Sequence, residues 1–297
     1  KKHQETTLNG DICMRIGFQP EDYYEEYNRK TVDFGNGRIE VVAYHSPQLK
    51  YLGNNRRSVL PTKKPVLSDA AQEERTRKQI YAIRRRIKWY ALSNDFRWFV
   101  TLTFDPGKID SFNFEIAKKA LLKWCRLMRD RYKRFDYIII PELHQSGAVH
   151  FHGLLGDIAA HFVEATHPRT GKPLVRHDRQ VYNLADWEYG YTDCEQIESP
   201  ERAASYITKY VTTALLANKE MYNKKRYFNS QGLNKPDVSY AMEDNEELSA
   251  FTPNFGVVDT DGSGRNVIDK GIYNLHRNSE TGELTQSDTD YLLIAKS

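Results

Sequence analysis

Two strand-like segments on either side of a short turn constrain the fold of this chain more than any other feature. The segments FDYIIIPEL (135–143) and AVHFHGLLG (148–156) are rich in apolar and β-branched residues. The turn sequence Gln-Ser-Gly stands between them at 145–147. Strand-like runs separated by a short turn containing glycine are typical of a β-hairpin. We therefore predict a hairpin across 135–156.

This hairpin would bring one acid and two histidines to a common face. Side chains alternate along a strand, so His150 and His152 share one face and Phe151 lies on the other. With a three-residue loop, Glu142 lies directly opposite His150, and cross-strand partners share a face. With a four-residue loop, Glu142 would pair with Phe151 instead, and joint chelation would be harder.

A carboxylate beside two imidazoles is a mixed oxygen and nitrogen ligand set. Such a set with open positions suits Mg²⁺ or Mn²⁺ acting on a phosphate, and the imidazoles favour Mn²⁺. We predict that Glu142, His150 and His152 bind this divalent metal. His144 has the parity of Glu142 and could assist, or it could lie exposed at the hairpin edge. The competing interpretation is a pair of packed or surface histidines without a metal.

A second cluster of reactive side chains lies in ASYITKYV (204–211), within a predicted helix. Tyr206, Lys209 and Tyr210 are spaced i, i+3 and i+4 and therefore share a helix face. A phenol can attack phosphorus when its anion is stabilised and the phosphate is polarised. Lys209 could stabilise that anion. The alternative is an aromatic stripe that packs on the sheet, in a chain with 19 tyrosines.

The order of the remaining signals favours an α+β fold. Strand signals fall at 31–46 (two strands around Gly-Asn-Gly), 96–104, 135–143 and 148–156; helix signals fall at 69–92, 111–132 and about 200–219, with a short helix possible at 157–165. The order strand–helix–strand–strand–helix predicts an antiparallel sheet with flanking helices. Residues 187–197 have the composition of turns, and periodicity fades beyond Leu233.

Charge is distributed unevenly although the net charge is only +3. Residues 71–134 hold 17 Lys/Arg against 7 Asp/Glu, whereas 235–297 hold 5 against 12. A basic middle region indicates a polyanionic partner, although a solvated helix face has the same composition. From the first long helix we predict Arg84, Arg85 and Lys88 as DNA contacts.

Composition also excludes some classes of protein. The three cysteines are far apart in the sequence, which argues against a disulfide scaffold and favours a reducing compartment. No segment approaches the roughly 20 apolar residues that span a bilayer, and no apolar segment typical of a signal peptide stands near the N-terminus. We therefore expect a cytoplasmic protein without a membrane partner.

Three segments occur in the order of the three motifs of HUH endonucleases: FVTLTF (99–104), ELHQSGAVHFHGLL (142–155) and YITKYV (206–211). The middle one resembles the metal motif of geminiviral replication proteins, and the last resembles bacteriophage initiators with paired tyrosines. The segments YNLADWEYGYTD and RYFNSQGLNKP also resemble initiators of this group. The chain thus resembles rolling-circle replication initiators of bacterial plasmids and single-stranded-DNA phages.

The resemblance implies a ferredoxin-like antiparallel sheet and a site chemistry. It makes Glu142, His150 and His152 the metal ligands. It makes Tyr206 the nucleophile that leaves a 5′-phosphotyrosine and a free 3′-OH, with Lys209 orienting or balancing charge. Tyr210 corresponds to a second nucleophile or to an aromatic neighbour. Thr101 and Thr103 would serve sheet packing or DNA backbone contact.

The expected function is therefore nicking and rejoining of single-stranded DNA at a replication origin. The expected partners are single-stranded DNA or an origin hairpin, with a host helicase and polymerase, because no GxxxxGK[ST] motif is present. Two alternatives stay open: an HUH relaxase or single-strand transposase, and a non-catalytic DNA-binding protein of the same fold. We divide the chain into an N-terminal extension (1–66), an HUH endonuclease domain (67–235) and an acidic C-terminal region (236–297). The sequence does not indicate the oligomeric state.

Overall fold

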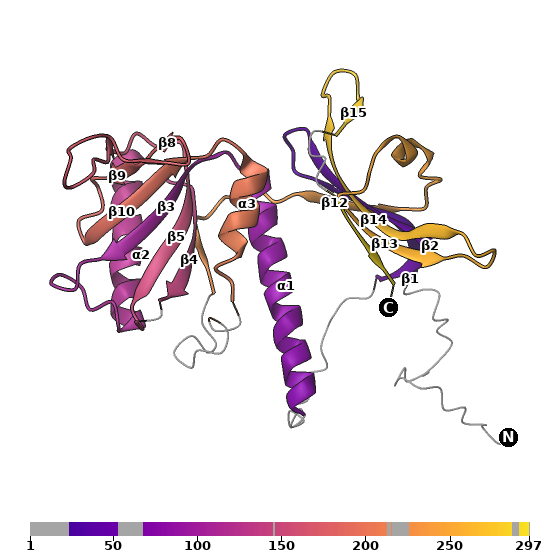
Figure 1. The fold of residues 1–297 in the computed structure, drawn as a ribbon, viewed down its shortest axis with the longest axis horizontal. Coiled ribbons are helices and arrows are strands. Elements are labelled where there is room, and N and C mark those ends of the chain that lie inside the picture. The colour runs from indigo at the N-terminus through magenta and orange to yellow at the C-terminus, as the bar shows by residue number, and fades with distance from the viewer. Residues whose placement is uncertain are drawn as a thin grey trace. The chain divides into compact units, whose positions relative to one another are not determined.

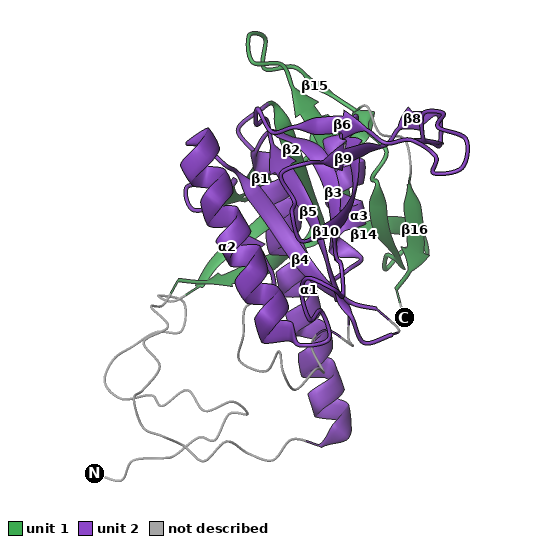
Figure 2. Cartoon of the chain, turned by 90° about the vertical axis from the view of Figure 1, so that its left-hand side faces the viewer, with its two compact units in different colours: residues 1–33, 37–63, 238–297 green, residues 34–36, 64–237 purple. Residues whose placement is uncertain are grey.

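The computed structural model describes residues 24–52, 68–144, 146–212, 215, 226–286 and 291–296. The chain divides into two compact units, which Figure 2 shows in different colours. Unit 1 comprises 1–33, 37–63 and 238–297, and unit 2 comprises 34–36 and 64–237. All of the predicted metal-binding, nucleophilic and DNA-contacting residues belong to unit 2.

Unit 2 is built on a seven-stranded antiparallel sheet with the strand order β11–β4–β5–β3–β10–β9–β6 (Figure 1). Its strands are β3 (Phe96–Phe104), β4 (Tyr137–Leu143), β5 (Val149–Gly156), β6 (Phe162–Glu164), β9 (Tyr182–Leu184), β10 (Gly190–Gln196) and β11 (Phe228–Asn229). A separate small hairpin consists of β7 (Val175–Arg176) and β8 (Arg179–Gln180). The long central strands β4, β5, β3 and β10 carry the candidate site.

Three helices belong to unit 2: α1 (Asp69–Ser93), α2 (Phe114–Tyr132) and α3 (Pro200–Thr208). Each begins at a polar N-cap whose side chain accepts a hydrogen bond from a backbone N–H of the first turn; the caps are Ser68, Asn113 and Ser199. Proline at the start of α3 fits the first helical position, where its missing N–H leaves no hydrogen bond unmade.

Helix α2 covers the face of the sheet that carries Phe151. The buried Trp124 of α2 packs against Trp187, which packs against Phe104, and Phe104 packs edge-to-face on Phe151. His152 has the opposite parity and stacks on a residue that follows α3, as described below. The two faces of the sheet therefore have separate roles, one packing on α2 and the other carrying the polar residues of the candidate site.

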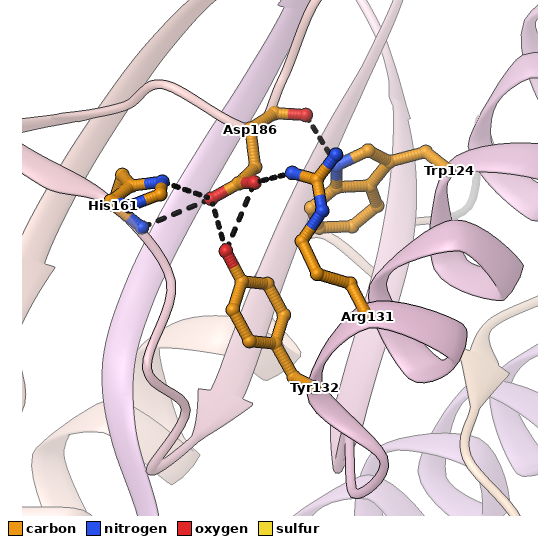
Figure 3. A network of polar contacts seen from close by, with 5 residues as sticks. All are labelled: Trp124, Arg131, Tyr132, His161 and Asp186. Atoms are coloured by element: carbon orange, nitrogen blue, oxygen red, sulfur yellow. Dashed lines mark hydrogen bonds and ion pairs between the residues drawn. The ribbon is translucent and has the colours of Figure 1, made fainter.

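Asp186 fastens the connection between β9 and β10 to α2 (Figure 3). Its side chain is only 1% exposed and forms an ion pair with Arg131. It also accepts hydrogen bonds from the Tyr132 hydroxyl at 3.0 and 3.1 Å and from the His161 N–H at 3.0 Å. The Trp124 indole donates to the Asp186 carbonyl at 3.0 Å. A buried carboxylate with several donors of this kind is fully paired.

Unit 1 is a second sheet, formed by segments far apart in the sequence, with the order β12–β1–β2–β14–β13–β16 and β15 paired to β14. Its strands are β1 (Tyr24–Asp33), β2 (Arg38–Tyr51), β12 (Asp237–Ala241), β13 (Phe255–Thr260), β14 (Asn266–Arg277), β15 (Leu284–Thr285) and β16 (Leu292–Ala295), with a 3-10 helix at Glu246–Ala250. Ile39, Val41, Leu248, Tyr273 and Leu275 form its buried cluster. The acidic C-terminal region thus contributes most of the strands of this sheet.

The predicted α+β class, with an antiparallel sheet and flanking helices, is confirmed. The hairpin predicted within 31–46 is also present, with longer strands than expected. Gly35 and Gly37 both have positive φ values of 78° and 81°, which a side chain would disfavour. The helix expected at 111–132 begins only at Phe114, because Asn113 caps it.

Three local predictions were wrong. The short helix expected at 157–165 is absent, and Phe162–Glu164 forms β6, where Phe162 stacks on Trp98 with ring centroids 3.7 Å apart. The turn-like segment 187–197 contains β10, which pairs with β3 along its whole length. Tertiary packing and strand pairing therefore override the local propensities in both segments.

The third error concerns the helix expected from about 200 to 219. Helix α3 ends at Thr208, and the next residues form turns. Thr208 donates from its hydroxyl to the Ser205 carbonyl, and Val211 and Thr212 follow; β-branched residues favour a helix only weakly. Most residues beyond 212 in the predicted helix lie outside the described residues. Within the described part of the chain, none of the helices is both long and apolar enough to cross a membrane.

Candidate active site

The hairpin adopts the register that a three-residue loop requires. Glu142 pairs with His150, and the His144 N–H donates to the Ala148 carbonyl at 2.9 Å. Gly147 has a φ of 90°, the left-handed conformation expected at the end of such a loop. Gln145 lies outside the described residues. The acid and both histidines therefore lie on one face, as predicted.

Glu142 makes its closest contact with the second histidine. Its Oε2 lies 2.7 Å from His152 Nε2; His152 is 8% exposed and Glu142 is 40% exposed. His150 is half-buried and stacks on His144, with ring centroids 5.3 Å apart. The exposed position expected for His144 at the hairpin edge is observed, together with this contact to His150.

Two threonines of β3 contact the other side of each imidazole. Thr101 Oγ1 lies 3.1 Å from His152 Nδ1, and Thr103 Oγ1 lies 3.4 Å from His150 Nδ1. A partner on one ring nitrogen sets which nitrogen is left to act as a ligand. The alternation in FVTLTF put both threonines on one face, but only the sheet register shows that this face carries the histidines.

Both imidazoles are favoured in the neutral form, which is the form that binds metals. Burial lowers the pKa of His152, although the nearby Glu142 carboxylate partly opposes this effect. Burial also lowers the pKa of His150, the charge of His144 adds to this effect, and Glu142 again opposes it.

The residues that the structure describes contain no ready-made group of three His, Cys, Asp or Glu side chains that could hold a metal ion. Glu142 contacts His152 in this arrangement, rather than lying between the two histidines. The donor set itself, two imidazoles and a carboxylate on one face, is chemically suited to a divalent cation. The metal-binding role of these residues stays a prediction.

The predicted tyrosine cluster lies against the histidine face. Tyr210 stacks on His152, with ring centroids 3.6 Å apart and an interplanar angle of 8°. Tyr206 lies edge-on to Tyr210 at 5.8 Å and to Phe99 of β3 at 5.2 Å. Lys209 Nζ lies 5.0 Å from the centre of the Tyr206 ring. The two motifs that contain these residues are therefore in direct contact in space.

The two tyrosines differ in accessibility. Tyr206 is 47% exposed, whereas Tyr210 is half-buried against His152. Burial raises the pKa of Tyr210 well above its usual value, and a hydrogen bond and the charges of Tyr206, Glu142 and Asp193 add to this effect. Tyr206 is thus the hydroxyl that a large substrate can reach.

A pocket of about 520 Å³ lies beside Tyr206. Its floor is formed by β3 and β10, one wall by α3 and the residues after it, and the other wall by the β7–β8 hairpin. We call it the hairpin pocket. Charged side chains dominate its lining; among them are Arg176, Arg179, Asp193, Glu198, Arg202 and Lys209.

The predicted DNA contacts on α1 are placed differently from one another. Arg84 donates from Nε and Nη2 to the Val211 carbonyl at 3.1 and 2.9 Å, so it fastens the segment after α3 to α1. Arg85 lies over the Trp89 ring at 5.3 Å and is exposed. Lys88 is half-buried. The predicted DNA contacts of these residues stay predictions, but Arg84 also has a structural role.

The family model of the replication-associated protein ORF2 matches residues 97–215. The resemblance to a rolling-circle replication initiator is confirmed for this segment. The match begins in β3 and extends past α3, so it includes the histidine hairpin, the tyrosine cluster and the hairpin pocket. No curated protein and no solved structure matches the chain.

Sequence reasoning missed Asp193 and the β7–β8 hairpin. Asp193 pairs with Thr101 in the sheet, and Thr101 pairs with His152, so Asp193 shares the face of the histidines. The available signal was the alternation in GYTDCEQ, with the buried Cys194 between Asp193 and Glu195. This signal was obscured by the glycine and the polar residues, which are typical of turns.

Proposed function

We propose that this protein is a replication initiator that nicks and rejoins single-stranded DNA at a replication origin through Tyr206. The observation that carries the proposal is the contact between two distant motifs. Tyr210 stacks on His152, and the exposed Tyr206 lies beside Tyr210 on the face that also holds Glu142 and His150. The match of 97–215 to a replication-associated family supports the same assignment.

The proposed step is a transesterification at phosphorus. The Tyr206 oxygen forms a bond to the scissile phosphorus, and the bond from phosphorus to the 3′ oxygen breaks. The phenol proton passes to solvent through the open side of the site, and the leaving 3′ oxygen takes up a proton. Attack of that 3′-OH on the phosphotyrosine reverses the step and rejoins the strand, so the energy of the phosphodiester is conserved.

The residues around Tyr206 have separable tasks in this proposal. Lys209, which lies over the Tyr206 ring, stabilises the phenolate electrostatically as it forms. Phe99 packs edge-on against Tyr206 and limits its orientations. Tyr210 holds the plane of His152 by stacking.

Glu142, His150 and His152 would hold a divalent cation, Mg²⁺ or Mn²⁺. Their shared face, the low exposure of His152 and the lowered pKa values of both histidines fit this role. Such an ion, when bound, polarises a phosphate oxygen and stabilises the charge that develops there. The Glu142 side chain, being 40% exposed, has room to turn from His152 toward a shared ligand.

Formation of a covalent adduct tests the proposal. The full chain is incubated with Mn²⁺ and labelled single-stranded oligonucleotides that tile its own replicon, and adducts are resolved by denaturing electrophoresis. We expect a labelled band that resists SDS, requires the metal and is lost in Tyr206→Phe. Tyr191→Phe is the matched control, because Tyr191 is 70% exposed on β10 but is absent from the pocket lining.

Salt-sensitive DNA binding by a folded protein that forms no adduct on any oligonucleotide would contradict the proposed function. That result would instead favour a DNA-binding protein without catalytic activity.

A further inference from the structure

The hairpin pocket contains cations that carboxylates already hold in place. Arg176 lies 2.7 Å from Asp193 and 3.5 Å from Glu195, and Arg179 lies 2.9 Å from Glu198. A guanidinium has five N–H donors, so an arginine paired with a carboxylate keeps donors for a ligand. The lining thus offers oriented donors beside carboxylate acceptors, the combination that reads the edge of a nucleobase.

The wall formed by α3 carries cations of a different kind. Arg202, Tyr206 and Lys209 are spaced i, i+4 and i+7, so they follow one another along one helix face, and all three are exposed. Among the described residues, neither Arg202 nor Lys209 has an ion-pair partner. With a rise of about 1.5 Å per residue, Arg202 stands roughly 6 Å along the axis from Tyr206. This spacing suits contacts to neighbouring phosphates of one strand.

The hairpin that carries Arg176 and Arg179 has a tight turn in an unusual conformation. His177 and Asp178 have φ values of 49° and 61°. Two consecutive left-handed residues make a two-residue hairpin turn, in which asparagine and glycine are usual. A backbone conformation of this kind costs roughly 1–2 kcal/mol for each residue with a side chain. The turn sets both arginines at the rim of a pocket that also contains Tyr206.

We propose that the hairpin pocket binds the base of one unpaired nucleotide beside the scissile phosphate, and that Arg176 and Arg179 select guanine there. Guanine presents acceptors at O6 and N7 for the arginines and N–H donors on its other edge for the carboxylates. Arg202 binds a neighbouring backbone phosphate and adds affinity without selecting a base. The inference rests on the proposed function, because that function makes single-stranded DNA the substrate.

A selection experiment tests this proposal without requiring cleavage. The full chain carrying Tyr206→Phe is incubated with a randomised 20-nucleotide single-stranded DNA library, and the bound sequences are read. We expect one position with a preference for guanine of about tenfold or more, the size of a good arginine–base contact. The added changes Arg176→Gln and Arg179→Gln are expected to reduce that preference below about threefold and to leave other positions unchanged.

Two further variants separate base selection from charge. Arg202→Gln is expected to weaken binding of all sequences equally and to lower the salt slope by about 1. Arg134→Gln is the matched control, because Arg134 is an exposed arginine paired with Asp136 that lies outside the pocket lining. It should leave both the preference and the affinity unchanged. Tryptophan fluorescence verifies that each variant is folded.

Two results would overturn the pocket assignment: no base preference at any position, or a guanine preference that persists in the Arg176→Gln, Arg179→Gln variant. These results are distinguishable from failure of the proposed function. If the protein forms an adduct on Tyr206 but the preference does not depend on the arginines, only the pocket assignment is wrong. If the preference depends on the arginines but no adduct forms, only the nicking function is wrong.

Discussion

Tyr206 and Tyr210 stand four residues apart in the same cluster, yet their surroundings assign them different roles. Tyr210 is half-buried, and its ring lies parallel to that of His152. Tyr206 is exposed and lines the hairpin pocket beside Lys209. A nucleophile must reach phosphorus in line with the leaving oxygen, which an exposed hydroxyl allows and a stacked, half-buried ring hinders. Accessibility therefore favours Tyr206 as the nucleophile.

Lys209 provides a test at the scale of a single side chain. Lys209→Gln removes the cation over the Tyr206 ring, and we expect the rate of adduct formation to fall about 10- to 100-fold, or roughly 1.4–2.7 kcal/mol of barrier. Single-turnover kinetics at saturating DNA measures this rate. Lys123→Gln, at an exposed lysine of α2, should leave the rate unchanged. An unchanged rate in Lys209→Gln would exclude an electrostatic role for Lys209.

The strand elements determine how precisely the histidine face is assembled. Gly190 begins β10, and a Cβ there would overlap the backbone of Thr103 and Phe104, coming within 2.7 Å of the Phe104 carbonyl carbon. Only glycine lets β10 approach β3 this closely at that point. The register that places Asp193 beside Thr101 starts from this contact.

Gly190→Ala should therefore destabilise unit 2 by several kcal/mol, because the backbone must move to relieve the overlap. Gly107→Ala is the control; its new Cβ would meet only the Asp105 carboxylate, at 3.3 Å, and this side chain can shift. Urea unfolding followed by tryptophan fluorescence measures the effect, since all four tryptophans lie in unit 2. Equal stability of the two variants would contradict the close approach of β10 to β3.

Asp186 links α2 to the β9–β10 connection and makes this linkage depend on pH. Burial by itself would raise the pKa of Asp186, but hydrogen bonds from His161 and Tyr132 and the Arg131 guanidinium outweigh it and lower the pKa. A carboxyl group with a lowered pKa stabilises the folded state above its unfolded pKa of about 3.9. This stabilisation is lost as the pH falls through the folded-state pKa.

Asp186→Asn should accordingly lower the free energy of unfolding by about 2 kcal/mol at pH 7, because the amide group replaces one acceptor oxygen with a donor. The difference from the unmodified chain should shrink below about pH 3, where both side chains are neutral. Urea unfolding across this pH range tests the linkage. A difference that does not change with pH would show that the charge of Asp186 makes no contribution.

The sequence predicted those elements whose patterns are local. The hairpin of β4 and β5, the register of Glu142 and His150 and the start of α1 follow from alternation, turn chemistry and a cap. Strand β10 was missed because GYTDCEQ combines turn residues with a pairing to β3 more than 80 residues away. The early end of α3 was missed because helical spacing outweighed the β-branched residues in the prediction. The pocket required both of these elements.

At the scale of the whole molecule, residues before 64 and after 237 form the sheet of unit 1, and those between form most of unit 2. Nothing in the local patterns of either terminal segment indicates that they share a sheet, since such pairing spans more than 200 residues. The strand β2 pairs directly with β14, for example Val42 with Ile272. The acidic residues of the C-terminal region therefore belong to a folded sheet over its described part.

We expect residues 64–237 to fold without the remainder of the chain. The sheet, α1, α2 and α3 are all contained in this fragment, and its buried core is its own. Its urea transition, followed by tryptophan fluorescence, should resemble that of the whole chain, and it should form the same adduct with DNA. A fragment without a cooperative transition would show that unit 2 depends on unit 1.

The most direct measurement for the central claim is the identity of the residue that carries the DNA. The adduct formed with a single-stranded oligonucleotide is digested with trypsin and nuclease, and the modified peptide is sequenced by mass spectrometry. We predict a nucleotide 5′-phosphate on Tyr206, with Tyr210 unmodified. Attachment at Tyr210 alone, at a tyrosine outside the cluster, or at no tyrosine would contradict the account.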